Sequence, residues 1–158
     1  MNRVLFVCLG NICRSPAGEG VFAHLVEKRG LSAQIQVDSA GTMGYHTGSP
    51  ADSRMRQAAT RRGYDLTSRA RCFDPADFDR FDFIIAMDNQ NLRDIRAQDP
   101  EGLHSENIYL LCDLIPGRRG EDVPDPYYGG SDGFETVLDL MEEAATHLID
   151  EIARRDRS

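Results

Sequence analysis

The sequence predicts an α/β fold, a single domain in which helices cover both faces of a parallel sheet. Apolar runs with strand-like composition alternate along the chain with segments of helical periodicity, a pattern typical of parallel sheets. The 158 residues are enough for one domain, residues 1–158, to bury a core without a metal or disulfide framework. We find neither an internal repeat nor an interdomain linker.

The first strand is expected at residues 3–8, where β-branched and aromatic side chains gather. A helix should begin near Ser15-Pro16, since proline is tolerated in a first turn, and end at Gly30. Further strands are expected at residues 34–37, 81–87 and 107–112, and further helices at residues 51–62, 89–97 and 134–152. Residues 116–132 form a long loop rich in Gly, Pro and Asp, and such loops often carry function.

Composition limits the partners and the compartment. The net charge of −8 argues against a nucleic-acid-binding protein, whose surface is usually basic. No signal peptide and no apolar stretch of about 18 residues is found, so we expect no membrane insertion. The four cysteines match no paired zinc spacing and are sparse for a secreted disulfide scaffold, which favours the reducing cytoplasm. Cys72 and Cys112 are expected in the core, and the chain is expected to be a monomer.

The segment Cys8-Leu9-Gly10-Asn11-Ile12-Cys13-Arg14-Ser15, here called the phosphate loop, joins the first strand to the first helix. Unpaired N–H groups and the positive end of the helix dipole meet at such a junction and can hold an anion. The bare pattern of a cysteine six residues before an arginine is not specific. A strand-turn-helix junction with an inert buried cysteine is the alternative at this point.

If the loop is functional, each residue type has a chemical reason. Cys8 would attack phosphorus as a thiolate, which the helix N-terminus and Arg14 stabilise. Arg14 can bond two phosphate oxygens and neutralise charge in the transition state. The Ser15 hydroxyl can donate to the departing thiolate, while Asn11 is expected to brace the loop. Together these residues indicate covalent phosphoryl transfer through a cysteine, with neither metal nor other cofactor.

Such a mechanism needs an acid to protonate the leaving oxygen and then a base to activate water. Asp125 is the candidate, because Pro124 and Pro126 restrict the backbone around it. Pro-Asp-Pro is also an ordinary surface turn, so the residues alone leave this assignment open.

Four motifs occur in a defined order along nearly the whole chain. They are Val7-Cys8-Leu9-Gly10-Asn11-Ile12-Cys13-Arg14-Ser15-Pro16, Asp38-Ser39-Ala40-Gly41-Thr42, Ala86-Met87-Asp88 with Asn91-Leu92-Arg93-Asp94, and Pro124-Asp125-Pro126-Tyr127-Tyr128. In this order the chain resembles the low-molecular-weight protein tyrosine phosphatases. The resemblance implies a four-stranded parallel sheet in the order 2-1-3-4 and hydrolysis of protein phosphotyrosine, with tyrosine-phosphorylated proteins, tyrosine kinases among them, as partners.

The resemblance also assigns roles to residues. It implies Cys8 as nucleophile, Arg14 as phosphoryl ligand and Asp125 as acid and then base. The phosphate would be bound by Leu9, Gly10, Asn11, Ile12, Cys13, Arg14 and Ser15, an aryl ring by Tyr45 and Tyr127, and the loop would be supported by Asn11, Ser15, Ser39 and Asp88. For the two tyrosines the alternative is an ordinary half-exposed loop position, and for Asp88 it is the cap of the helix from Asn89.

Two further points concern Cys13 and the segment before Arg71. Cys13 could trap oxidised Cys8 as a disulfide and so protect it, the redox control that the family implies; otherwise it is a small buried residue. Many members carry a histidine shortly before an Ala-Arg pair, where it supports the phosphate loop. Here Ser68 or Arg69 stands near that position, which leaves the bracing of the loop undecided.

Four other functions share parts of this pattern. A thioredoxin-coupled arsenate reductase needs two further cysteines close together, and Cys72 and Cys112 are far apart. Arginine-phosphate phosphatases of this fold tend to carry threonine where this chain has Ile12, so Ile12 favours phosphotyrosine. A phosphotyrosine-binding module without catalysis could dispense with Cys8 or Asp125, and a redox sensor would use only the cysteines.

Overall fold

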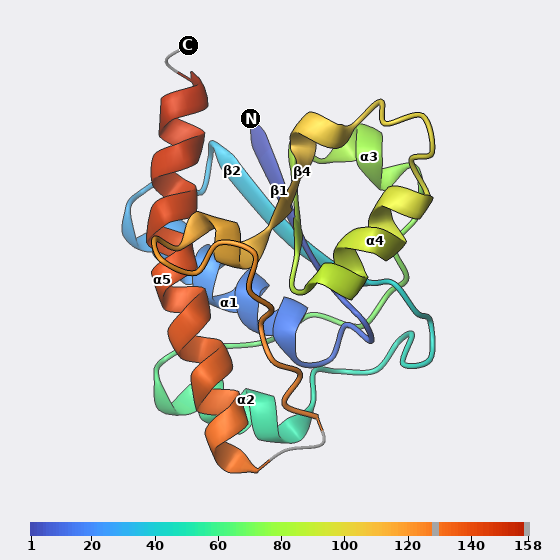
Figure 1. The fold of residues 1–158 in the computed structure, drawn as a ribbon. Coiled ribbons are helices and arrows are strands. Elements are labelled where there is room, and N and C mark those ends of the chain that lie inside the picture. Colours follow the sequence, from blue (N-terminus) through green and yellow to red (C-terminus); the bar gives the residue numbers. More distant parts are fainter. Residues whose placement is uncertain (128–129, 157–158) are drawn as a thin grey trace.

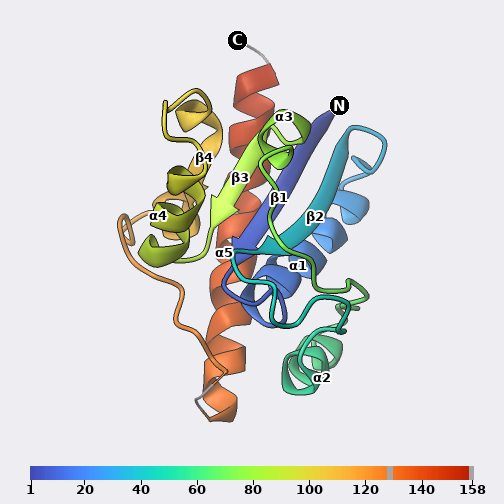
Figure 2. The same cartoon turned by 90° about the vertical axis from the view of Figure 1, so that its right-hand side faces the viewer.

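A four-stranded parallel sheet in the order β2-β1-β3-β4 forms the centre of the protein (Figures 1 and 2). Its strands are β1 (Asn2–Cys8), β2 (Ile35–Gly41), β3 (Phe83–Ala86) and β4 (Ile108–Leu110). The structure is a computed structural model that describes residues 1–127 and 130–156. Tyr128 of the fourth motif therefore lies outside the described residues. The predicted fold class and strand order are confirmed.

Helices cover both faces of the sheet (Figure 2). On one face lie α1 (Arg14–Lys28), α2 (Ser53–Arg61) and α5 (Ser131–Asp156), and on the other lie α3 (Asp77–Arg80) and α4 (Asn89–Ala97). Two short 3-10 helices, η1 (Ser105–Asn107) and η2 (Leu111–Leu114), flank β4. No described helix has the length and apolar character that crossing a membrane requires.

Strand β1 is buried on both faces, so its apolar run feeds two cores. Val4 and Phe6 pack in the core under α1 and α5, whereas Leu5 and Val7 pack in the core under α4. Because side chains alternate across a strand, the unbroken apolar sequence of β1 serves both layers at once.

The main differences from the sequence prediction concern β2, β4 and α3. β2 continues beyond Val37 to Gly41, because Asp38–Gly41 pair in register with Leu5–Cys8 of β1. The predicted strand at 107–112 ends at Leu110, where the chain turns into η2, and helix α3 was not predicted at all. The expectation that Cys72 is a core residue is wrong: Cys72 is exposed, because its extended segment turns Phe73 inward instead, whereas Cys112 is buried.

The end of β2 supports the phosphate loop through close backbone approach. The Thr42 and Met43 amides donate to the carbonyl oxygens of Cys8 and Leu9 at 2.9 Å each. A Cβ atom on Gly41 would lie 2.8 Å from the Leu9 carbonyl oxygen and 3.1 Å from the Asn11 nitrogen. Glycine is therefore required at this position by space rather than by its own backbone angles.

Candidate functional site

Cys8 is the last residue of β1, and its thiol is buried at the start of the phosphate loop. Its Sγ lies 3.0 Å from Ser15 Oγ and accepts the Asn11 amide hydrogen at 3.3 Å. Helix α1 begins at Arg14, and the side chain of its N-cap residue, Cys13, makes no capping hydrogen bond. The first amides of this helix therefore remain available to an anion, as the sequence predicts.

A cavity of about 160 Å³ opens over the loop. It brings together, from three separate parts of the chain, Cys8, Leu9, Gly10, Ile12, Cys13, Arg14, Tyr45, His46, Asp125 and Tyr127. Nearly all the residues expected to contact substrate thus meet in one place. The exceptions are Asn11 and Ser15, whose side chains are buried behind the loop and do not line the cavity. Tyr45 is 80% exposed and Tyr127 is 37% exposed, so both stand at its rim.

Arg14 is buried and held in place by three groups. Its Nη1 donates to Asp88 Oδ2 at 2.6 Å and to the Val123 carbonyl oxygen at 3.0 Å, and its Nη2 lies 3.6 Å from Asp125 Oδ2. Burial alone would lower the pKa of Arg14, but Cys8, Asp88 and Asp125 outweigh it and raise the pKa. The guanidinium therefore stays charged although it is withdrawn from water.

Asp88 performs both of the functions between which the sequence could not choose. One carboxylate oxygen, Oδ2, accepts from Arg14, while the other, Oδ1, accepts the Asn91 amide hydrogen at 2.7 Å and caps α4. The position of Arg14 is thereby tied to the N-terminus of a helix on the far face of the sheet.

Asn11 braces the loop from within. Its backbone has φ of +58°, a left-handed conformation that asparagine tolerates better than most residues. Its Nδ2 donates to Ser15 Oγ at 2.7 Å and to Ser39 Oγ at 3.0 Å, and its Oδ1 accepts the Arg71 amide hydrogen at 3.0 Å. Asn11, Ser15 and Ser39 thus form one buried network, as the resemblance implies.

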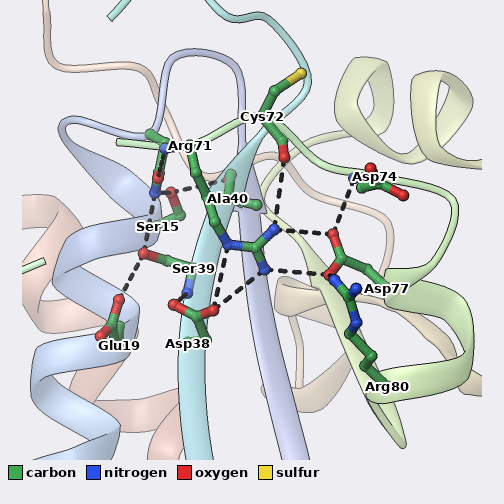
Figure 3. Close-up of polar contacts among 11 residues, drawn as sticks. Ser15, Glu19, Asp38, Ser39, Ala40, Arg71, Cys72, Asp74, Asp77 and Arg80 are labelled. Atoms are coloured by element: carbon green, nitrogen blue, oxygen red, sulfur yellow. Dashed lines mark hydrogen bonds and ion pairs between the residues drawn. The ribbon is translucent and has the colours of Figure 1, made fainter. Parts of the chain in front are cut away.

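Charged groups surround this network on β2 and beside it (Figure 3). Arg71 reaches Asp77, whose side chain is fully buried, at 3.0 Å, and Asp38 at 3.2 Å. These ion pairs fix the segment whose amide holds Asn11, and they connect it to β2 and α3. Asp77 also accepts the Asp74 amide hydrogen at 2.9 Å, so the buried carboxylate is well satisfied.

Glu19, on α1, joins the buried network through hydrogen bonds to two serines. Ser39 Oγ donates to Glu19 Oε1 at 2.5 Å, and Ser68 also hydrogen-bonds this carboxylate. Arg69, the other candidate for the histidine's position, is exposed and donates to the Gly48 carbonyl oxygen instead. Burial, the largest cause, raises the pKa of Glu19.

Asp125 lies in the stretch of residues 123–127, here called the acid segment. Its Oδ1 accepts the Tyr127 amide hydrogen at 3.0 Å, and its Oδ2 faces Arg14 across the cavity. The side chain is 37% exposed, so water and substrate can both reach it. The turn closed by the Tyr127 amide points the carboxylate toward the phosphate loop.

Cys13 lines the same cavity as Cys8 but differs in its electrostatics. Burial, followed by the charges of Asp52, Cys8 and Asp125, raises the pKa of Cys13 strongly. Burial and the neighbouring negative charges therefore favour the neutral thiol of Cys13.

Sequence reasoning missed several members of the site. His46 lines the cavity, with its ring 6.3 Å from that of Tyr127, and its place directly after Tyr45 was the available signal. Glu19 was missed too, although it follows Ser15 by one helical turn and so lies on the same helix face. The Val123 carbonyl oxygen and the Arg71 amide act through the main chain, which residue types do not reveal.

Comparisons with known proteins agree with this geometry. The family model described as low molecular weight phosphotyrosine protein phosphatase matches residues 3–158. A low molecular weight protein-tyrosine-phosphatase of Streptomyces coelicolor is 45% identical over 93% of this chain and 91% of its own. The human low molecular weight phosphotyrosine protein phosphatase is 44% identical over 85% of each chain.

Among solved structures, a protein tyrosine phosphatase from Entamoeba histolytica with Hepes in its active site superimposes with a TM-score of 0.94. It is 42% identical in sequence, and the match covers 99% of both chains. Family, sequence and fold therefore agree over essentially the full length given. The chain belongs to the low molecular weight phosphotyrosine protein phosphatase family of enzymes.

Proposed function

We propose that this protein is a cysteine-dependent phosphomonoesterase that hydrolyses protein phosphotyrosine through a phosphocysteine intermediate. The observation that carries the proposal is the convergence of the Cys8 thiol, the Arg14 guanidinium and the Asp125 carboxyl group on one cavity. Residues 1–158 act as one phosphatase domain. Its sparse, unbridged cysteines favour the reducing cytoplasm.

In the first step the Cys8 thiolate attacks phosphorus and a P–S bond forms. The bond between phosphorus and the phenolic oxygen breaks, and protonated Asp125 gives its proton to that oxygen, so tyrosine leaves neutral. Arg14 and the loop amides bind the phosphoryl oxygens and stabilise the charge of the transition state.

In the second step a water molecule attacks phosphorus while the Asp125 carboxylate takes its proton. The P–S bond breaks, inorganic phosphate forms and the thiolate is restored. The Ser15 hydroxyl, 3.0 Å from the sulfur, donates to the thiolate as it departs. Asp125 is then protonated again and ready for the next substrate, so no other cofactor enters the cycle.

Phosphotyrosine is the substrate that the walls of the cavity favour. Tyr45 and Tyr127 offer ring faces at the rim, against which a flat aryl group can stack. Ile12 lines the wall with an apolar side chain and offers no hydrogen bond to a guanidino group. Tyrosine-phosphorylated proteins, including tyrosine kinases, are therefore the proposed partners of a monomeric enzyme.

We further propose that Cys13 protects Cys8 by forming a disulfide when Cys8 is oxidised. Cys8 and Cys13 both line the same cavity, and the neutral Cys13 thiol does not compete as a nucleophile. The sulfenic acid of oxidised Cys8 would condense with the Cys13 thiol, releasing water and stopping further oxidation.

The test of the proposed function is turnover of a phosphotyrosine peptide by the reduced protein without added metal. Cys8→Ser should lower kcat at least about a thousandfold, and Asp125→Asn about a hundredfold. Cys72→Ser, which removes an exposed thiol outside the cavity, is the matched control and should keep full activity. An inert reduced wild-type protein, or an active Cys8→Ser variant, would contradict the proposal.

A further inference from the structure

Arg54, in the first turn of α2, reaches from that helix to the acid segment without entering the cavity. Its Nη2 donates to the Tyr127 carbonyl oxygen at 3.1 Å, and its guanidinium carbon lies 5.5 Å from the centre of the Tyr127 ring. It does not line the cavity. We propose that Arg54 is a positioning residue for general acid catalysis: it fixes the acid segment so that Asp125 can protonate the leaving group. This inference rests on the role proposed above for Asp125.

The contacts of Arg54 connect the acid segment to the phosphate loop. Asp52 donates its amide hydrogen to the Ile12 carbonyl oxygen at 2.8 Å, which attaches the start of α2 to the phosphate loop. The Asp52 carboxylate accepts from Arg54 Nε at 3.1 Å and from Nη2 at 2.9 Å, a two-pronged pair. Arg54 then reaches Tyr127, so three residues span the distance from one catalytic segment to the other.

Asp52 itself is well anchored, which makes the connection stiff. Its carboxylate also caps α2 by accepting the amide hydrogens of Arg54 and Met55 at 2.8 Å and 3.4 Å. Burial would raise the pKa of Asp52, but the hydrogen bonds from Arg54 outweigh it and the pKa is lowered. The anchor is therefore ionised at neutral pH.

Tyr127 transmits this position to Asp125 through its main chain. Its carbonyl oxygen is held by Arg54, and its amide hydrogen is held by Asp125 Oδ1 at 3.0 Å. Both polar groups of one residue are thus occupied, one on each side of its Cα atom. Moving the carbonyl group would rotate the amide that orients the Asp125 carboxyl group.

Cation–π contacts with two aromatic rings hold the guanidinium plane. Arg54 lies 4.9 Å from the centre of the Phe134 ring of α5 as well as near the Tyr127 ring. Arginine can make the paired bonds to Asp52, the bond to the carbonyl oxygen and the ring contacts with one planar group. A lysine at this position would keep the charge but could not make these contacts together, which separates geometry from charge in a test.

The consequence for the reaction depends on the leaving group. A poor leaving group such as phenol needs the proton from Asp125, whereas p-nitrophenol departs readily as its anion. Displacing Asp125 should therefore slow hydrolysis of phenyl phosphate more than hydrolysis of p-nitrophenyl phosphate. Because kcat/KM covers all steps up to departure of the alcohol, its dependence on the acidity of the leaving phenol measures how well the proton is delivered.

The experiment compares Arg54→Gln and Arg54→Lys with wild type over a series of aryl phosphates. Both variants should lower kcat/KM for phenyl phosphate about tenfold and that for p-nitrophenyl phosphate less than about twofold. Arg61→Gln is the matched control, because it removes a positive charge from the same helix at a residue that pairs with Glu135 of α5. It should leave the series unchanged.

Asp125→Asn and the double variant Arg54→Gln/Asp125→Asn complete the design. Asp125→Asn should make kcat/KM depend more steeply on the acidity of the leaving phenol. Adding Arg54→Gln should not change that dependence further, because no acid remains to be positioned. If Asp125→Asn leaves the series unchanged, the proposed function itself fails. The inference about Arg54 is overturned if Asp125→Asn makes the dependence steeper but Arg54→Gln lowers kcat/KM equally for all substrates or behaves like Arg61→Gln. It is also overturned if Arg54→Gln adds its effect to that of Asp125→Asn in the double variant.

Discussion

Replacing Asn11 by alanine tests whether the buried network supports the phosphate loop. The change removes three hydrogen bonds, those to Ser15, Ser39 and the Arg71 amide. It also places alanine in a backbone conformation with φ of +58°, which is less favourable for alanine than for asparagine.

The size of the effect follows from what each partner keeps. Ser15 retains Cys8 and the Ala40 carbonyl oxygen, and Ser39 retains Glu19, so each of these two lost bonds costs about 1 kcal/mol. The partly buried Arg71 amide loses its acceptor, and an orphaned donor of this kind costs about 1–3 kcal/mol. With the backbone strain, we expect the free energy of unfolding to fall by about 4 kcal/mol, a large share of a typical total of about 5–15 kcal/mol.

Urea unfolding followed by circular dichroism measures this difference directly. Asn2→Ala removes an exposed side-chain hydrogen bond to Asp156; it is the control and should change stability by less than about 1 kcal/mol. At temperatures where Asn11→Ala stays folded, kcat/KM should fall at least about tenfold, because the loop amides lose their fixed directions. A loss below about 1 kcal/mol with unchanged kcat/KM would refute the reasoning.

Three other predictions follow from the same surroundings. Gly41→Ala places a Cβ atom 2.8 Å from a phosphate-loop carbonyl oxygen, so it should destabilise the fold by about 1–3 kcal/mol, as other overpacking substitutions do, and lower kcat/KM at least about tenfold. The control is Gly44→Ala, whose Cβ atom would have its nearest neighbour at 3.5 Å. It should change neither the free energy of unfolding nor kcat/KM. Because the pKa of Glu19 is raised in the folded protein, its contribution to stability is complete below the ordinary glutamate pKa of about 4.3 and is lost as pH rises through the raised value. In denaturation curves, Glu19→Gln should therefore gain stability relative to wild type as pH rises from acid to neutral. A difference in unfolding free energy between the two proteins that stays constant with pH would contradict this sign. Mild peroxide should inactivate the enzyme reversibly, with thiol restoring less activity in Cys13→Ala than in wild type, and equal recovery would rule out protection of Cys8.

Much of the fold could be predicted because local signals and packing agree. Helix α4 begins and ends where predicted, at Asn89 and Ala97, since the capping residue Asp88 and the apolar periodicity give the same answer. The end of β2 could not be predicted in this way. Residues Asp38–Gly41 lack an apolar pattern, and only their pairing with β1 makes them a strand.

In the candidate site, too, features set by local sequence could be predicted, whereas features set by contacts between distant segments could not. The phosphate loop is contiguous, so its residue types and spacing state its chemistry, and Asp125 stands out between two prolines. The contributions of His46 and Arg54 depend on how separate segments meet around the cavity, which no local pattern encodes. The sequence left the role of Asp88 open between two contacts, and its carboxylate makes both, one with each oxygen.

Because the Asp88 carboxylate bonds both Arg14 and the Asn91 amide, this amide, on the opposite face of the sheet, reports on the active site. An oxyanion that draws Arg14 toward itself changes the hydrogen bond between Arg14 and the Asp88 carboxylate. The same carboxylate accepts the amide hydrogen of buried Asn91. Binding of vanadate or phosphate should therefore slow hydrogen exchange at Asn91, far along the chain from the phosphate loop. Conversely, fraying of the first turn of α4 would release the arginine before the sheet loosens, so on gentle heating activity should disappear ahead of global unfolding.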